Sequence, residues 1–584
     1  PTTMEDSPKR DNICFYFQKG EPCKRGASCQ FLHHCSEEET KGITDEDMDL
    51  CVDMITKISR NMEFFHSKAC RKLRKALHPL VDDLRKRSFK GTTRSDYEEK
   101  KMIAQERKGR EARQKALDQN YLNSVRLRKE RLDKLEQLKD SQVGAKDVPL
   151  IPDGVALGGE SAGTLLCDGA RAEAESVGTT VDVKILHKPR ACYVCKRRYT
   201  TLHHFYDMLC PECAELNFRK RNQSADLKGY RALVTGGRVK IGYRIVLKLL
   251  RAGAHVVVTT RFPKDCALRY SKEGDFSAWS SRLDIFGLDL RDIPSLEFFC
   301  GYMNETLKGS GGLDIIINNA CQTIRRPVKY YTPLLRTELK PVHALSDRHS
   351  AELESVLAKQ QALQTDRLEH LRGAAEENKS LEDGPRGPNG SSVVPSAAYS
   401  RAAHLEEMIS SARQSQIPLV PEDITSTAAE FPTEIVDVNG QQVDLRKKNT
   451  WVTLLQEVET PELAEVFAIN AMAPFVLNSR LVSSLKASAN ESKFVINVSA
   501  MEGKFNRVKS GYHPHTNMAK AALNMMTLTS AKELSKSNIF MTSVDTGWIN
   551  DENPLWKANL YAKAHNFQTP LDEVDAAARV LDPV

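Results

Sequence analysis

The stretch "GYRALVTGGRVKIGYRIVLKLLRAGAHVVVTTRFP", residues 229–263, decides the fold of the chain. An apolar run leads into a glycine turn, which is followed by apolar residues at helical spacing and by a second apolar run rich in valine. This order of strand, turn, helix and strand is typical of a parallel sheet with crossover helices, and the alternation continues from residue 227 onward. Such a turn brings backbone N–H groups and a helix N-terminus close to a pyrophosphate, so the stretch indicates a nucleotide-binding α/β domain.

Five further motifs follow the glycine turn in a fixed order: "LDL" at 288–290, "LDIIINNA" at 313–320, "FAINAMAPF" at 467–475, "KFVINVSAMEG" at 493–503 and "TNMAKAALNMMT" at 516–527. This ordered set resembles the short-chain dehydrogenase/reductase superfamily over residues 227–325 and 450–584. The resemblance implies a Rossmann-type, doubly wound parallel sheet that binds NAD or NADP.

The resemblance also implies roles for single residues. Carried over by position, the residues that would contact the cofactor are Gly236, Gly242, Asp289, Asn319 and Lys520, and the asparagine with a structural or proton-relay role is Asn470. Gly236 and Gly242 are the outer glycines of the phosphate turn, and Asp289 is the acid near the adenine ring.

The end of the second strand bears on the choice of cofactor. NAD-binding proteins usually place an acid there, which accepts a hydrogen bond from the ribose, whereas an arginine favours the 2′-phosphate of NADP. Here the strand ends "VVVTTRFPK", with Arg261 and no acid, so we predict NADP(H). The alternative is that Arg261 is a solvated surface charge.

The chain departs from the family pattern at its acid–base positions. Thr516 stands where the family has its catalytic tyrosine, and Ala500 stands where it has a serine, which leaves Ser499 one residue early. In the phosphate turn, Lys240 replaces the middle glycine. A threonine hydroxyl is a far weaker acid than a phenol, and general acid–base catalysis contributes roughly 100- to 10,000-fold to a rate. His515 is the best substitute, because an imidazole titrates near neutral pH; the alternative is a histidine in a loop without a chemical role.

A short Cys/His-dense segment lies near the start of the chain. "CFYFQKGEPCKRGASCQFLH" has the spacing C-x8-C-x5-C-x3-H and resembles the CCCH zinc finger family, with the predicted ligands Cys14, Cys23, Cys29 and His33. Fingers of that family typically bind single-stranded RNA by stacking bases on aromatic rings. We therefore predict zinc and RNA as partners, while the alternative is that the rings of this segment only cover the metal.

A second cysteine pattern occurs in "CYVCKRRYTTLHHFYDMLCPEC". Its spacing, C-x2-C-x14-C-x2-C, predicts a closed structural zinc site with the ligands Cys192, Cys195, Cys210 and Cys213. A redox role for one CxxC pair is the weaker alternative, because the paired arrangement explains all four cysteines at once.

Composition predicts how the rest of the chain is divided. The predicted divisions are the finger at 11–35, a charged helical region at 36–142, a linker at 143–188, the four-cysteine zinc module at 189–215, and a partly disordered insertion at 326–449 that interrupts the dehydrogenase-like domain. The basic helix of the second region is either solvated or in contact with RNA.

The 584 residues contain no apolar run of 18, which predicts no membrane span. Free thiols beside zinc ligands favour the cytosol or the nucleus.

Three functions remain open at this point. The first is a binding or regulatory protein that holds RNA and NADP(H) with little dehydrogenase turnover. The second is a working NADP(H)-dependent oxidoreductase that uses His515, or Ser499 with Thr516. The third is a scaffold that binds neither cofactor nor substrate. A homo-oligomer is compatible with each of them.

Overall fold

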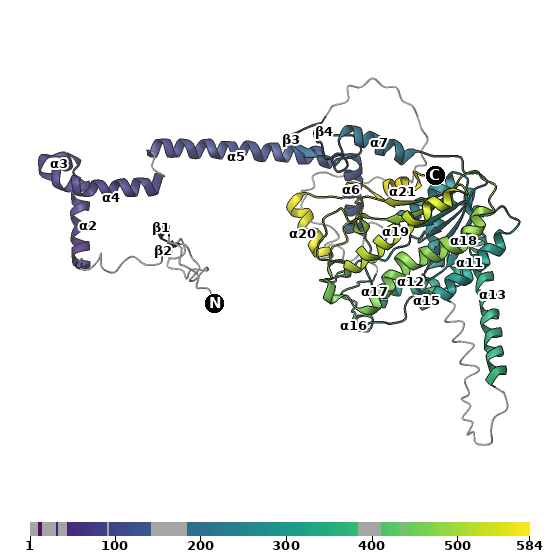
Figure 1. Cartoon of the computed structure of the whole chain (residues 1–584). Helices are drawn as coiled ribbons and strands as arrows, with labels where there is room; N and C mark the ends of the chain where they lie inside the picture. The colour runs from purple at the N-terminus through teal and green to yellow at the C-terminus, as the bar shows by residue number, and fades with distance from the viewer. Residues whose placement is uncertain are drawn as a thin grey trace, which may run out of the picture. The chain divides into compact units, whose positions relative to one another are not determined.

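The computed structural model describes residues 10–13, 31–32, 42, 44–89, 93–141, 184–382, 410–433, 435–437 and 440–584 (Figure 1). The predicted finger ligands Cys14, Cys23, Cys29 and His33 lie outside the described residues, as does the predicted linker up to residue 183. Two compact units divide the chain, Pro1–Arg113 and Gln114–Val584.

The described residues of the first unit are mainly helical. They form β1 (Arg10–Ile13), β2 (Phe31–Leu32), α2 (Asp45–Ser59), α3 (Met62–His66), η2 (Lys68–Cys70), α4 (Arg71–Phe89) and the first part of α5 (Arg94–Asn123). Helix α2 begins at a capping box, in which the Thr44 hydroxyl accepts from the Asp47 N–H and the Asp47 carboxylate accepts from the Thr44 N–H. This reciprocal cap explains why the helix starts within an acidic stretch.

A six-stranded parallel sheet forms the centre of the second unit. Its strands are β5 (Arg231–Thr235), β6 (His255–Thr260), β7 (Leu283–Gly287), β8 (Ile315–Asn318), β9 (Lys493–Ser499) and β10 (Ile539–Asp545). Their spatial order is β10-β9-β8-β5-β6-β7, which is the order of a doubly wound Rossmann-type sheet. The predicted α/β fold class is confirmed.

Helices cover both faces of this sheet. Consecutive residues of β5 show why, because Leu233 and Val234 are both fully buried but belong to different hydrophobic clusters on opposite faces. One face is covered by α8 (Lys240–Arg251), α9 (Pro263–Tyr270), α10 (Phe276–Trp279) and α21 (Glu573–Leu581). The other is covered by α11 (Ile293–Leu307), α18 (Ala473–Lys486) and α19 (Pro514–Ser535), with α11 and α18 side by side (Figure 1).

The four-cysteine module packs onto this domain. It consists of the antiparallel strands β3 (Ile185–Ala191) and β4 (Arg198–Thr201) and of α7 (Pro211–Asn222). Basic helix α6 (Arg126–Ser141) covers it, with Arg128 buried in an ion pair to Asp207 at 3.1 Å. Arg221 of α7 reaches Asp572 of the sheet domain at 2.5 Å. At least one face of the basic region is therefore structural.

Most of the described residues between 328 and 449 also pack on the domain. They form α12 (Val328–Glu338), η4 (Val342–Ala344), α13 (Ser350–Glu382), α15 (Ser411–Gln414) and α16 (Glu422–Thr425). Leu353 and Val356 of α13 are fully buried in the cluster that also holds strands β5 and β6. Part of the range predicted as an insertion thus shares the core of the domain.

The remaining elements lie near the end of the chain or in connections: η3 (Ser280–Arg282), η5 (Thr450–Val452), η6 (Leu455–Glu457), α17 (Thr460–Phe467), η7 (Ala468–Met472), η8 (Met501–Gly503) and α20 (Leu555–His565). The continuous helical run Thr460–Lys486 is long and apolar enough to cross a membrane by length and composition. Leu477, Leu481 and Leu485 of this run are fully buried beside the sheet, as expected of a core helix.

Candidate functional site

The glycine turn follows β5 at the carboxyl edge of the sheet. Gly236 has a φ of +69°, and a Cβ atom there would lie 2.9 Å from Cα of Ala320. At Gly242 a Cβ would lie 2.2 Å from the carbonyl oxygen of Gly236. The Asn319 amide donates to the carbonyl oxygens of Thr235 and Gly236 at 3.1 and 3.2 Å. Three residues predicted for the cofactor site therefore meet here, at positions where two of them must be glycine.

Lys240 takes the place of the middle glycine of this turn. Its φ is +52°, in the left-handed region that favours glycine. A residue with a Cβ pays roughly 1–2 kcal/mol for that conformation. The turn thus keeps the backbone geometry of a glycine without the glycine, and α8 begins at this residue.

Arg261 lies at the end of β6, as the sequence predicts, but it is not a solvated charge. Its guanidinium donates to the hydroxyl of Tyr331 at 3.0 Å, and its Cζ lies 4.8 Å from the centre of that ring. The rings of Phe262 and Tyr331 stack at 5.5 Å, within a cluster that also contains Ala412. Residues of the insertion therefore build the surroundings of Arg261.

Two further arginines gather at the same place. Arg238, from the glycine turn, pairs with Asp265 at 2.7 Å. Arg326 lies over the ring of Tyr330 at 4.6 Å, and its buried Nε has no hydrogen-bond partner among the described residues. Burial alone would raise the pKa of Tyr331, but the guanidinium groups of Arg261, Arg326 and Arg238 hold this pKa below its ordinary value. The local potential is therefore positive.

Asp289 follows β7 and is buried. Its carboxylate accepts from the guanidinium of Arg291 at 2.7 Å, and Arg291 also pairs with Glu465 at 2.6 Å. Sequence patterns predict Asp289 but neither of its partners in this chain of ion pairs, Arg291 and Glu465.

The predicted acid–base positions come together at the end of β9. Lys520 is buried, and its ammonium donates to the carbonyl oxygen of Val498 at 2.7 Å. Ser499 is the next residue, and Thr516 precedes Lys520 by one helical turn of α19. The hydroxyls of Ser499 and Thr516 are buried, and neither has a hydrogen-bond partner within the described part of the chain. Buried hydroxyls are rarely left unpaired, which makes these two candidates for a functional role.

Asn470 lies in the π-helical turn η7 between α17 and α18. Its amide oxygen accepts from the backbone N–H of Gln322 at 2.8 Å, and its amide nitrogen donates to the Gln322 carbonyl at 3.1 Å. Single π-helical turns inside α-helices occur frequently at functional sites. The predicted asparagine is thus held against the segment that follows β8.

His515 lies in a buried pair that the sequence did not predict. Its Nε2 is 3.2 Å from a carboxylate oxygen of Glu462, and its buried Nδ1 has no partner among the described residues. The neighbouring His513 stacks on Trp451 with 3.8 Å between ring centres, and burial lowers the pKa of its imidazole. A cavity of about 390 Å³ adjoins this segment, lined by 451–452, 501–502, 507–510, 512–513, Asn517 and Asn553.

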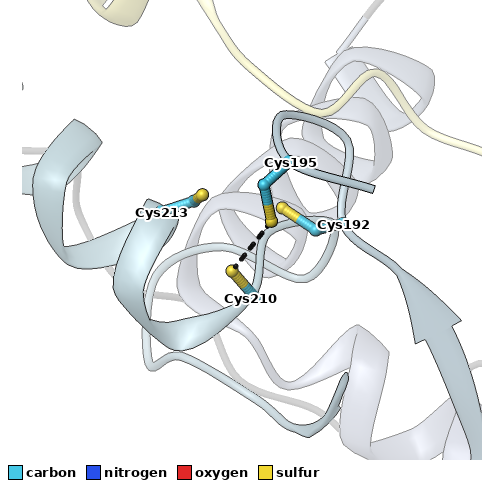
Figure 2. Close-up of side chains that lie close together, drawn as sticks. All are labelled: Cys192, Cys195, Cys210 and Cys213. Carbon is cyan, nitrogen blue, oxygen red and sulfur yellow. Dashed lines mark hydrogen bonds between the residues drawn. The ribbon is translucent and has the colours of Figure 1, made fainter. Parts of the chain in front are cut away.

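The second predicted metal set is assembled as a cluster. The Sγ atoms of Cys192, Cys195, Cys210 and Cys213 all lie within 4.8 Å of one another, and Figure 2 shows them turned toward a common centre. No disulfide joins them. Zn–S bonds of about 2.3 Å in a tetrahedron separate the sulfur atoms by about 3.8 Å, which fits this arrangement. His203 and His204, which lie between the two cysteine pairs in the sequence, are not part of the cluster.

Hydrogen bonds from Arg197 lower the pKa of the Cys195 thiol to about 6, whereas burial raises the pKa of Cys210.

Sequence signals for the missed residues are weak. Arg325 and Arg326 lie five and six residues after Ala320, the last residue of the Asn-Asn-Ala turn, and adjacent arginines so close to a buried strand need partners. Nothing in the local sequence indicates Glu462 or Glu465.

Known proteins resemble parts of this chain. Residues 230–335 match the short chain dehydrogenase family. An uncharacterized protein of Acanthamoeba polyphaga mimivirus is 30% identical over 411 residues, which cover 68% of this chain and 71% of that protein. A protein of Streptomyces lividans named "Probable oxidoreductase" is 33% identical over 108 residues, covering 18% of this chain and 33% of that protein. The NADPH-bound carbonyl reductase from chicken fatty liver is 17% identical, with a TM-score of 0.31, covering 60% of this chain and 95% of that one.

Proposed function

The chain belongs to one family with the uncharacterized mimivirus protein and contains a short-chain dehydrogenase domain, and on this premise we propose that the domain binds NADP(H). The observation that carries the proposal is the positive cluster at the end of β6. Arg238, Arg261 and Arg326 converge there, and among the described residues only Arg238 has a carboxylate at hydrogen-bonding distance; the nearest to Arg326 is 3.7 Å away. Guanidinium groups bind phosphates by paired hydrogen bonds, so this cluster fits the 2′-phosphate that distinguishes NADP from NAD.

The other predicted residues would contact the remaining parts of the cofactor. The turn at Gly236 and the start of α8 would receive the pyrophosphate, and Asn319 and Lys520 would hold the nicotinamide ribose. Asp289 would lie at the adenine ring. When bound, the reduced cofactor supplies a hydride.

We propose further that ordinary dehydrogenase turnover is low. Reduction of a carbonyl needs a proton donor at the developing alkoxide, and Thr516 is a far weaker acid than the tyrosine of the family. Ser499 keeps a hydroxyl near the place of the missing serine. A domain that holds the cofactor without fast turnover suits a sensor or a regulatory protein.

A second candidate function is a working oxidoreductase with an atypical acid. The observation that favours it is the buried pair of His515 and Glu462, because the carboxylate orients the imidazole through Nε2 and leaves Nδ1 as the ring nitrogen that would exchange a proton with a substrate. The scaffold hypothesis would require that no cofactor binds.

The four-cysteine cluster supports a structural zinc ion, since four converging thiols without a disulfide are typical of a closed zinc site. Zinc in the CCCH finger and RNA as its partner rest on the sequence alone. Crosslinking of the full chain to RNA tests this part, and crosslinking that is indifferent to Cys29→Ser would rule out the finger as the contact.

Calorimetric titration of the full chain with NADPH and NADH tests the main proposal. We expect NADPH to bind more tightly than NADH, and Arg261→Ala to weaken NADPH binding by about tenfold or more, because a hydrogen bond to a charged group contributes roughly 1.5–3 kcal/mol. Arg480→Ala is the control, since Arg480 pairs with exposed Glu297 on another surface. Absence of NADPH binding at millimolar concentration would leave the scaffold hypothesis.

A further inference from the structure

Glu465 is the centre of a buried network that no local sequence pattern reveals. It lies on α17, and its carboxylate is 5% exposed. One oxygen pairs with Arg291, and the other accepts from Nε of Arg325 and from the amide of Gln322, both at 3.0 Å. Three donors from two different segments therefore converge on one side chain.

Two branches of this network lead to predicted cofactor residues. Through Arg291 it reaches Asp289, which is assigned to the adenine end of the site. Through Gln322 it reaches Asn470, whose side chain is bonded to the Gln322 backbone at 2.8 and 3.1 Å. The network thus spans from the adenine acid to the proton-relay asparagine.

The third branch leads into the insertion. Arg325 forms a paired interaction with Asp423 of α16, at 2.8 and 2.7 Å, and the Asp423 carboxylate is fully buried. The backbone N–H groups of Leu419 and Val420 also donate to this carboxylate, at 2.8 and 3.1 Å. Asp423 is therefore fixed by its own loop as well as by Arg325.

The charges of this network depend on one another. Three carboxylates, on Asp289, Glu465 and Asp423, face two guanidinium groups, and every member is largely buried. Removing one partner of a buried ion pair leaves an uncompensated charge, which must find another partner or draw in water. Loss of Asp423 would therefore free Arg325 to turn and to pull Glu465 away from Arg291 and Gln322.

We propose that Asp423 is a positioning residue of the cofactor site, and that the insertion completes this site by holding Asp289 and Asn470 in place through Arg325 and Glu465. The inference rests on the proposed binding of NADP(H). By this inference, the segment around α16 is a functional part of the domain, although the segment lies about 100 residues after the Asn-Asn-Ala motif in the chain.

The test is binding of NADPH and of 2′,5′-ADP to the full chain, measured by calorimetry and by the fluorescence of the nicotinamide. We expect Asp423→Asn to weaken NADPH binding by about tenfold, within the range known for coupled residues outside a ligand site. Binding of 2′,5′-ADP, which reports only the adenine end, should weaken less, because that ligand lacks the part near Asn470. The fluorescence of bound NADPH should change as well, which a purely structural role would not cause.

Asp284→Asn is the matched control. Asp284 is a buried carboxylate near the start of β7, and it also joins the insertion to the sheet, through Lys359 of α13 at 2.7 Å. Its loss should lower the thermal midpoint and leave the NADPH dissociation constant within about twofold. Glu465→Gln, which keeps the size of the side chain, provides a second variant in case Asp423→Asn fails to fold.

A double variant tests whether Asp423 acts on the cofactor site through Arg325. If Asp423 acts through Arg325, adding Asp423→Asn to Arg325→Met should not change the dissociation constant further. Wild-type protein that does not bind NADPH would refute the proposed function itself. Wild-type protein that binds NADPH, with folded Asp423→Asn and Glu465→Gln binding it equally well, would refute this inference alone.

Discussion

Nε2 of His515 lies 3.2 Å from a carboxylate oxygen of Glu462, and both side chains are buried between helices α17 and α19. His515 stands directly before the threonine that replaces the family's tyrosine. The pair joins the first turn of α17 to the first turn of α19, so it stabilises the wall of the site whether or not it moves a proton.

Removing the carboxylate should expose that structural contribution. We expect Glu462→Ala to lower the free energy of unfolding by about 1–3 kcal/mol, because a buried imidazole nitrogen loses its partner. Thermal unfolding of the full chain measures the effect. Glu533→Ala, which removes an exposed pair with Lys536 on the same helix, should have little effect; an equal loss in both variants would contradict the role of the buried pair.

Substitutions at Gly236 and Lys240 of the phosphate turn are expected to change the stability of the domain in opposite directions. Gly236→Ala should destabilise the domain and weaken NADPH binding, because its φ is +69° and a Cβ would lie 2.9 Å from the Ala320 backbone. Lys240→Gly should raise stability by about 0.5–1 kcal/mol, as relief of the left-handed strain outweighs the extra chain entropy of glycine. Thermal midpoints and NADPH titrations measure both, and a destabilised Lys240→Gly would show that the lysine side chain makes contacts of its own.

The raised pKa of the Glu338 carboxyl predicts that the stability of the protein depends on pH. Burial raises the pKa of this carboxyl from 4.5 to about 7, although it accepts from the N–H groups of Lys264 and Asp265. Because the folded state binds the proton more tightly, the stabilisation by protonated Glu338 is complete below pH 4.5 and is lost as the pH rises through about 7.

Glu338→Gln should therefore gain stability relative to wild type at pH 8, by about 1–3 kcal/mol, and show no such gain at about pH 4.5. Denaturation at a series of pH values measures the difference. A difference between the two proteins that is the same at every pH would contradict a raised pKa.

Metal content separates the two predicted zinc sites. The full chain should carry two zinc ions, and Cys195→Ser and Cys29→Ser should each remove one of them. Elemental analysis of purified protein gives the count, with Cys51→Ser, an exposed cysteine outside both sets, as the control. A Cys195→Ser variant with unchanged zinc content would mean that the four converging thiols do not hold the metal.

Much of the fold and part of the site follow from local patterns. The glycine turn, the valine-rich strand that ends at Arg261 and the Asn-Asn-Ala segment at Asn319 are each encoded in a few consecutive residues, and the structure brings them to one edge of the sheet. The same holds for the four-cysteine module, whose spacing alone identifies the thiols that converge. Glu462 and Glu465 could not be predicted in this way, because nothing near them in the chain indicates what they face.

By itself, then, the sequence determined the order of strands and helices, the places where only glycine fits and the loss of the family's tyrosine. These depend on backbone geometry and residue chemistry, which act over a few residues. Only the tertiary structure decided that an inserted segment supplies Asp423 to Arg325, 98 residues away in the chain. The strength of an ion pair depends on the distance between the charges in space and on their burial, and neither quantity can be read from the spacing of residues along the chain.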